Sequence, residues 1–202
     1  MKKIYKIVIT GGPCAGKTTA MKMIEKSFTE LGYAVLKIPE TATELISGGI
    51  TPVNVGSEQF QQHLIKLQLY KEEMFESAST YLPSDKILIL HDRAAMDNKG
   101  YMDYDAFCRI IKNINMTEEQ LMSRYDGVIH METAAKASKD LYQLENNEAR
   151  FETVDEAIKT DNDLYSAWKD HPNFCSIKSN TDFVKKMSDL TEAIKSILKN
   201  KE

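Results

Sequence analysis

The feature that most constrains this sequence is the segment Gly11-Gly12-Pro13-Cys14-Ala15-Gly16-Lys17-Thr18. It matches the pattern G-x-x-x-x-G-K-[ST], in which backbone N–H groups of a P-loop surround phosphate groups. An apolar run at residues 4–10 precedes the segment, and an amphipathic stretch at residues 17–31 follows it. The pattern therefore stands in the strand–loop–helix context that it requires. We expect a nucleoside triphosphate, ATP or GTP, to bind at this P-loop.

The residues of the P-loop have distinct predicted roles. Glycines allow the backbone amides to turn toward the phosphates, and the N-terminus of the following helix adds the positive end of its dipole. Lys17 is predicted to bridge the β- and γ-phosphates, and the Thr18 hydroxyl to bind Mg²⁺. Cys14 is either a reactive thiol or a small residue that fits the loop. The predicted nucleotide-binding residues are Gly11, Gly12, Pro13, Cys14, Ala15, Gly16, Lys17, Thr18 and Thr19.

Apolar strand patterns alternate with helical patterns along most of the chain. This alternation predicts a mostly parallel sheet covered by helices on both faces, which is the α/β, three-layer αβα fold of a P-loop NTPase. We expect one kinase-like domain over residues 1–202, with helical lid insertions at about 96–124 and 133–168. Ser57 and Thr181 are expected to cap helices. The expected strands cover residues 4–10, 34–38, 86–91, 127–131 and 174–177, and the other main helices cover 58–81 and 182–199.

Composition excludes several classes of function. The net charge of -4 provides no basic field to attract nucleic-acid phosphates, so a dedicated nucleic-acid-binding role is not favoured. The three cysteines are odd in number and lack metal-ligand spacing, which predicts neither a disulfide framework nor a zinc site and favours a reducing cytoplasm. No apolar stretch approaches the roughly 18 residues typical of a transmembrane segment.

A bound magnesium ion also needs a protein carboxylate, and Asp92 is the best candidate. It ends the most apolar predicted strand, so its side chain should emerge at the carboxyl edge of the sheet, where ligands of open α/β sheets bind. Thr18 and Asp92 are therefore the predicted metal ligands. The alternative is that Asp92 is a helix N-cap without a metal role. Glu40 ends the second strand in the same way and is predicted to face an acceptor.

The pair Asp92-Arg93, with Asp97 and Tyr101 beyond it, resembles nucleoside and ribosylnicotinamide kinases. The resemblance implies that Asp92 is a general base for an acceptor hydroxyl and that it helps to place magnesium. It also implies that Arg93 holds a phosphate or the acceptor, within a substrate pocket that includes Glu40, Arg93 and Tyr101. The competing interpretation makes Arg93 a structural partner of Glu40.

A narrower resemblance involves residues 125–135 and 144–153, and Ala167-Trp168 with His171-Pro172 extends it. These segments are similar to an AAA-type P-loop family whose members include the GTP-binding TRPL-translocation-defect-like proteins. Those relatives support a switch-like function as an alternative to catalysis.

In P-loop kinases, the segment after the fourth strand brings an arginine onto the transferring phosphate, and Arg150 occupies that place here. The alternative for Arg150 is an ion pair with Glu148 or Glu152. Lys136 and Lys139 lie in the same segment. The predicted catalytic residues are Lys17, Asp92, Arg93 and Arg150.

Together these features predict a Mg²⁺-dependent kinase that transfers the γ-phosphoryl group of ATP or GTP to the hydroxyl of a small-molecule acceptor. The alternative is a GTP- or ATP-dependent switch or an NTPase with a protein or phosphoinositide partner. The N-K-x-D pattern that reads guanine is absent, because Asn98-Lys99 is followed by Gly100-Tyr101. The sequence therefore does not reveal the preferred base, the acceptor or the oligomeric state.

Overall fold

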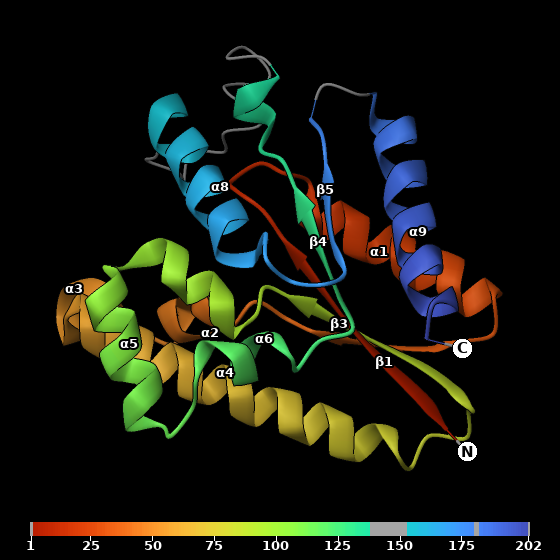
Figure 1. Cartoon of the computed structure of the whole chain (residues 1–202), viewed down its shortest axis with the longest axis horizontal. Helices are drawn as coiled ribbons and strands as arrows, with labels where there is room; N and C mark the ends of the chain where they lie inside the picture. The colour runs from red at the N-terminus through yellow and green to blue at the C-terminus, as the bar shows by residue number, and fades with distance from the viewer. Residues whose placement is uncertain (1, 138–152, 180–181, 202) are drawn as a thin grey trace.

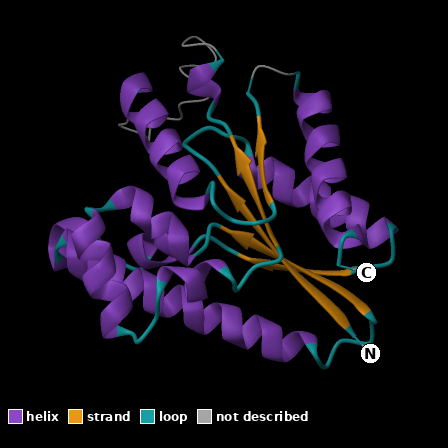
Figure 2. Ribbon diagram, viewed as in Figure 1, coloured by secondary structure: helices purple, strands orange, loops and turns teal. Residues whose placement is uncertain are grey.

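The computed structural model describes residues 2–137, 153–179 and 182–201. Its centre is a five-stranded sheet in the order β2-β3-β1-β4-β5, shown in Figures 1 and 2. Every neighbouring pair of strands is parallel, which confirms the predicted fold class and makes this sheet parallel throughout. The strands are β1 Lys3–Thr10, β2 Ala34–Ile38, β3 Lys86–Asp92, β4 Gly127–Met131 and β5 Phe174–Ile177.

One face of the sheet is covered by α1 (Lys17–Glu30) and α9 (Phe183–Lys199), which lie on the same side of the strands in Figure 1. Successive side chains of a strand point to opposite faces, so Ile7 and Ile9 of β1 both reach this layer. On α1, Ile24 and Phe28 are one turn apart and bury the same helix face against those strands. The packing in this layer places the N-terminus of α1 next to the carboxyl end of β1, with residues 11–16 between them.

The opposite face is covered by a larger set of helices, which includes most of the predicted insertions (Figure 1). Val8 and Val128 point into this layer and pack in one apolar cluster with Phe107 and Trp168. The insertions therefore contribute core as well as surface. The helices here are α4 Ser57–Ser79, η1 Ala95–Tyr101, α5 Tyr104–Asn113, α6 Glu118–Met122 and α8 Val154–Trp168, and shorter ones are α2 Thr41–Ser47, α3 Pro52–Val55 and η2 Ala134–Lys136.

Element boundaries differ from the sequence predictions by a few residues. Gly56 is the N-cap of α4, and Ser57 is already helical, so the prediction that Ser57 caps this helix was wrong. Gly56 has a φ of 87°, which glycine adopts readily. Asp182 caps α9 by accepting a hydrogen bond from the Lys185 N–H, and the predicted cap Thr181 lies outside the described residues.

Helix α4 carries a buried carboxylate, Glu72, that ties it to the segment before β4. Glu72 accepts hydrogen bonds from the Tyr125 hydroxyl at 2.7 Å and from Arg124 Nε at 2.9 Å. It also lies 3.7 Å from His91 Nδ1. Burial opposes ionisation of Glu72, but the neighbouring His91, Tyr125 and Arg124 lower its pKa. Glu72 is therefore charged in the folded protein.

We expect Glu72→Gln to lower the free energy of unfolding at pH 7 by about 2 kcal/mol, because charge-assisted hydrogen bonds in a buried site are lost. A carboxyl whose pKa is lowered by folding stabilises the protein above its ordinary pKa and loses that contribution as the pH falls. The difference between wild type and variant should therefore shrink below about pH 4. Urea unfolding across this pH range measures it, with exposed Glu73→Gln as the control. A difference that does not change with pH would contradict the charged role of Glu72.

Within the part of the chain that the structure describes, no helix combines the length and the apolar character needed to cross a membrane.

Candidate functional site

The P-loop joins the carboxyl end of β1 to the first residue of α1, at the upper end of the sheet in Figure 1. Gly11 has a φ of 139°, and a Cβ there would lie 2.0 Å from the carbonyl oxygen of Met131. Only glycine fits that approach to β4. The first turn of α1 contains no acidic residue, and its N-cap Gly16 has no side chain to compensate the amides. The helix N-terminus therefore presents an uncompensated positive end, as an anion site requires.

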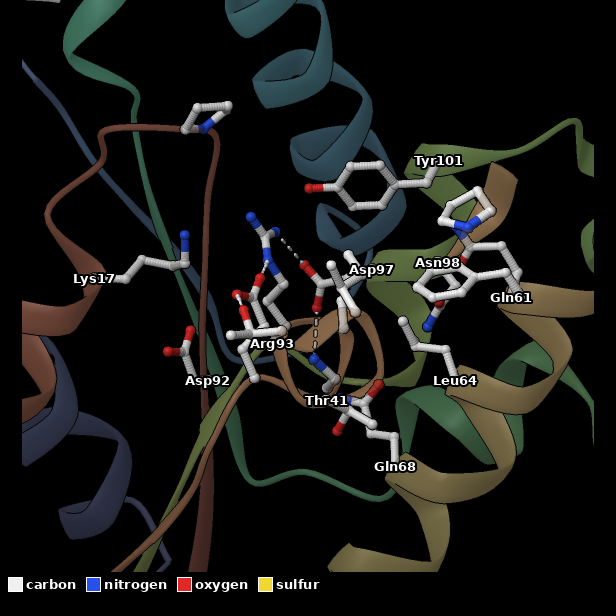
Figure 3. Close-up of a pocket in the computed structure, with 18 of the residues that line it drawn as sticks. Lys17, Thr41, Gln61, Leu64, Gln68, Asp92, Arg93, Asp97, Asn98 and Tyr101 are labelled. Carbon is white, nitrogen blue, oxygen red and sulfur yellow. Dashed lines mark hydrogen bonds and ion pairs between the residues drawn. The ribbon is translucent and has the colours of Figure 1, made fainter. Parts of the chain in front are cut away.

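A cavity of about 730 Å³ opens beside the P-loop and crosses the ends of β2 and β3 to reach α4. Figure 3 shows Lys17 and Asp92 at one end and Gln61, Leu64 and Gln68 at the other. Such a volume is in the range of small-molecule binding sites. The lining residues are Pro13, Lys17, Thr18, Glu40, Thr41, Ala42, Thr43, Ile46, Pro52, Phe60, Gln61, Leu64, Gln68, Asp92, Arg93, Ala94, Asp97, Asn98 and Tyr101.

Lys17 lies at the mouth of the P-loop with its Nζ 3.4 Å from the Gly11 carbonyl oxygen. Burial and the charge of Arg93 lower the pKa of Lys17 to about 8, although Asp92, Glu40 and Asp97 oppose this shift. Among the described residues, Lys17 has no carboxylate within ion-pair distance. Its ammonium group is thus held near carboxylates without being neutralised by direct contact. A phosphate group would supply the missing partner.

Asp92 ends β3, where it is level with Ile9 of β1. Its Oδ1 is buried and has no hydrogen-bond partner in the described part of the chain. Burial raises the pKa of Asp92, and the positive charge of Lys17 only partly opposes this. Thr18 is exposed and lines the same cavity.

The residues present fit a magnesium ion that is shared with phosphates. The described residues contain no group of three His, Cys, Asp or Glu side chains that could hold a metal by themselves. Mg²⁺ at P-loops needs only one or two protein oxygens, since water and phosphate oxygens complete its shell. The buried Oδ1 of Asp92 lacks a partner, and the exposed Thr18 hydroxyl lines the same cavity, so these two side chains would supply those oxygens.

Arg93 follows β3 in a left-handed conformation, with a φ of 67°. Its N–H donates to the Ile9 carbonyl at 3.1 Å, which helps to hold this turn. The side chain donates from Nε to Glu40 Oε1 at 2.7 Å and lies 3.6 Å from Asp97 Oδ1. The guanidinium carbon is 5.5 Å from the centre of the Tyr101 ring. A residue held against its conformational preference at a cavity is typical of functional sites.

The Arg93 contacts also decide its charge. Burial would lower the pKa of Arg93, but Tyr101, Asp97 and Glu40 raise it, so the guanidinium stays protonated. Burial alone would raise the pKa of Glu40. The charge of Arg93 and a hydrogen bond from Thr43 outweigh burial, so the pKa of Glu40 is lowered. The ion pair that the sequence offered as the alternative for Arg93 is therefore present. Arg93 still lines the cavity, so this pairing leaves it available to a ligand.

Asp97 is a site residue to which the sequence gave no role. It accepts a hydrogen bond from the Ala94 N–H at 2.7 Å and another from the Thr10 hydroxyl, and it is almost fully buried. These bonds fix the carboxylate beside Arg93. Asp97 is only four residues from Arg93, in the short segment that follows β3, and this closeness in the chain was an available signal.

The far wall of the cavity comes from α4. Gln61, Leu64 and Gln68 are three and four residues apart, so they share one helix face, and Figure 3 shows them together opposite the P-loop. The Oε1 atom of Gln61 is buried without a hydrogen-bond partner among the described residues. The sequence predicted a helix over residues 58–81 but assigned no role to these two amides. Their spacing places them on one helix face, but no pattern in the sequence indicates that this face borders a cavity.

Thr19 and Lys136, which the sequence also named, are not among the residues that line the cavity. Thr19 is exposed on α1 and is not part of the lining. Lys136 pairs instead with Asp161 of α8, at 2.7 Å. Arg150 lies outside the described residues, as do Glu148, Glu152 and Lys139, so its predicted role stays a prediction.

Comparisons with known proteins agree with this fold. An AAA domain family matches residues 6–186, which include the P-loop, Asp92 and every strand apart from the first residues of β1. A structure of deoxyadenosine kinase from M. mycoides with bound dATP has a similar fold, with a TM-score of 0.60 and 15% sequence identity. The similarity covers 94% of this chain and 99% of the kinase chain. No curated protein matches the sequence significantly. The chain belongs to the AAA domain family and is a P-loop nucleotide-binding protein with a kinase-like fold.

Proposed function

We propose that this protein is a Mg²⁺-dependent kinase that transfers the γ-phosphoryl group of ATP or GTP to a hydroxyl group of a small molecule. The observation that carries the proposal is the continuity of the cavity from Lys17 and Thr18 to Gln61 on α4. A hydrolase needs room only for the triphosphate and water, whereas a kinase needs a second compartment beside the phosphates. The volume of about 730 Å³ supports the two-compartment arrangement.

The donor compartment is the P-loop. Its backbone amides and the start of α1 would hold the phosphates, and Lys17 would contact the β- and γ-phosphates. Thr18 and Asp92 would hold Mg²⁺, which when bound neutralises phosphate charge. Lys17, which has no direct ion-pair partner among the described residues, supports this assignment.

The acceptor compartment would lie between the ends of β2 and β3 and the wall of α4. There Asp92 would take the proton from the acceptor hydroxyl while the acceptor oxygen bonds to the γ-phosphorus. The bond from that phosphorus to the β–γ bridging oxygen breaks, and the nucleoside diphosphate leaves. The raised pKa of Asp92 favours proton acceptance, and Arg93 would stabilise charge on the transferring group.

The buried amide of Gln61 supports an acceptor with hydrogen-bonding groups beyond the reacting hydroxyl. Around it, Phe60 and Leu64 offer apolar surface, so a planar or ring-containing molecule suits the compartment better than a charged headgroup. The resemblance to nucleoside kinases, and to a solved deoxyadenosine kinase, makes nucleosides the first class of acceptor to test.

The decisive experiment offers ATP or GTP with Mg²⁺ to the purified protein, alone or with an acceptor panel. The panel contains ribonucleosides, deoxyribonucleosides, ribosylnicotinamide and phosphoinositides, and mass spectrometry detects any phosphorylated acceptor. We expect triphosphate consumption that depends on one member of the panel. Equal consumption with and without acceptors would contradict the kinase proposal and support the NTPase or switch alternative.

For the acceptor that is found, we expect Gln61→Leu to raise its KM about tenfold, because a buried hydrogen bond to the substrate is lost. The KM for the triphosphate should not change, since Gln61 lies at the far wall from Lys17. Steady-state kinetics with each substrate varied in turn separates the two effects. Gln62→Leu is the matched control, because Gln62 is the next residue of α4 and does not line the cavity. Equal effects of the two changes would exclude a recognition role for Gln61.

A further inference from the structure

Asp161, on α8, is a fully buried carboxylate that takes no part in the chemistry proposed above. Its Oδ1 accepts a hydrogen bond from the Gly12 N–H of the P-loop at 2.9 Å. The same oxygen accepts from the Thr133 N–H, just after β4, at 3.1 Å. One side chain therefore joins three parts of the chain: the P-loop, the exit of β4 and α8.

The charge of Asp161 is balanced inside the protein. Lys136 Nζ lies 2.7 Å from its Oδ2, and His130 Nε2 lies 3.3 Å from its Oδ1. Burial opposes ionisation, but His130, Lys136 and the Gly12 N–H lower the pKa of Asp161 to about 2. A buried carboxylate is costly to desolvate, and in some proteins such a group is retained because it specifies one particular geometry.

The contact with the P-loop is too close for any other residue at position 12. A Cβ on Gly12 would lie 2.8 Å from the Asp161 Cβ and 3.2 Å from the Thr133 Cβ. Two further bonds join the same segments: the Thr133 hydroxyl donates to the Pro13 carbonyl at 2.5 Å, and the Ala134 N–H donates to the Cys14 carbonyl at 3.3 Å. The first half of the P-loop thus rests against the exit of β4 and α8.

We propose that Asp161 is a positioning residue that holds the P-loop in its phosphate-binding conformation. Amides that converge on an empty anion site repel one another, so a P-loop needs support before its ligand arrives. Asp161 does not line the cavity, so its bond to the Gly12 N–H anchors the loop from the side away from the ligand. This anchoring lowers the ordering cost of phosphate binding. The proposal rests only on nucleotide binding at the P-loop and does not depend on phosphoryl transfer.

The test compares Asp161→Asn with Asp126→Asn, a matched control. Asp126 is also a buried carboxylate that accepts from a backbone N–H, that of Lys6 at 2.7 Å, and it pairs with Lys201. It precedes β4, whereas Asp161 contacts residues just beyond the other end of that strand, near the P-loop. Calorimetric titrations with Mg²⁺–ATP and with inorganic tripolyphosphate measure binding by each variant, and urea unfolding measures stability.

Both variants should lose stability, but only Asp161→Asn should bind the two probes more weakly, by about 10- to 100-fold. The loss should be similar for ATP and tripolyphosphate, because the loop and not the base is affected. Unchanged affinity in a folded Asp161→Asn protein, or an equal loss in Asp126→Asn, would overturn the proposal. Failure of the kinase assay would leave this result untouched, since binding alone is measured.

A second measurement needs no variant and covers the case in which Asp161→Asn does not fold. Hydrogen exchange followed by NMR on the wild-type protein without nucleotide should show a protected Gly12 amide, because Asp161 accepts its proton. The Gly16 amide is the internal comparison, since Gly16 is exposed. Fast exchange at Gly12 in the absence of a ligand would refute a preformed anchor.

Discussion

Replacement of Lys17 by alanine is expected to lower kcat/KM for the triphosphate by about 10²- to 10³-fold, because a preorganised cation at the transferring phosphate is removed. The contacts in the site explain why no neighbour can substitute. Arg93, the other cation that lines the cavity, is held in its own place by Glu40 at 2.7 Å, so it cannot move to the position of the Lys17 ammonium group. Lys17 has no such ion pair among the described residues, so its charge is available to the ligand.

The control for this prediction is Lys22→Ala, which removes the same charge from an exposed position of α1. Its kinetics should match those of the wild type at moderate ionic strength, since exposed charges are screened by salt. Turnover and equilibrium nucleotide binding are measured for both variants. A Lys17→Ala enzyme that turns over at the wild-type rate would remove Lys17 from the phosphate site.

Replacement of Asp92 by asparagine is expected to lower acceptor phosphorylation by about 10²- to 10⁴-fold, because the proposed general base is lost. Asp92 and Glu40 both line the cavity, but the two carboxylates differ in the direction of their pKa shifts and in their hydrogen-bond partners. Burial raises the pKa of Asp92, and its Oδ1 has no partner among the described residues. Both oxygens of Glu40 are engaged, one by Arg93 and the other by Thr43. Asp92 is therefore the better proton acceptor.

Glu40→Gln is the matched comparison for this second prediction. It removes a carboxylate from the same cavity and weakens the hold on Arg93, so we expect a loss of about tenfold. Single-turnover measurements with saturating triphosphate isolate the chemical step. A larger loss in Glu40→Gln than in Asp92→Asn would assign the base to Glu40 and leave Asp92 with a metal role alone. Titration of both variants with Mg²⁺ tests that second role, since only Asp92→Asn should require more metal.

The strands and the P-loop were predictable because their signals are local. Apolar runs such as residues 86–91 bury both faces of a strand, and the glycines and Lys17 of the P-loop follow one another in the chain. The position of Asp92 at the carboxyl edge also followed from its place at the end of an apolar run. The parallel order of the sheet then brought the ends of β2 and β3 together, as strand–helix alternation suggests.

The sequence offered the pairing of Arg93 with Glu40 only as an alternative, and it did not indicate the other contacts that join the site together. Arg93 binds Glu40, which is 53 residues away in the chain. Glu40 is therefore a paired carboxylate of the cavity, whereas Asp92 Oδ1 has no hydrogen-bond partner among the described residues. Gln61 becomes part of the cavity only because α4 packs beside η1. The sequence predicts a helix over residues 58–81 and contains no pattern that would single out an amide on it.

The P-loop illustrates both what the sequence determines and what only the tertiary structure decides. Its sequence was sufficient to predict a phosphate-binding loop between Gly11 and Thr18, because the backbone conformation of the loop and the start of the helix are encoded by adjacent residues. The tertiary structure decided what holds the loop in place, since Asp161 reaches the Gly12 amide from 149 residues away. A hydrogen bond between such distant residues depends on how α8 packs after the whole sheet has formed. No local pattern encodes that packing, so only the folded chain reveals it.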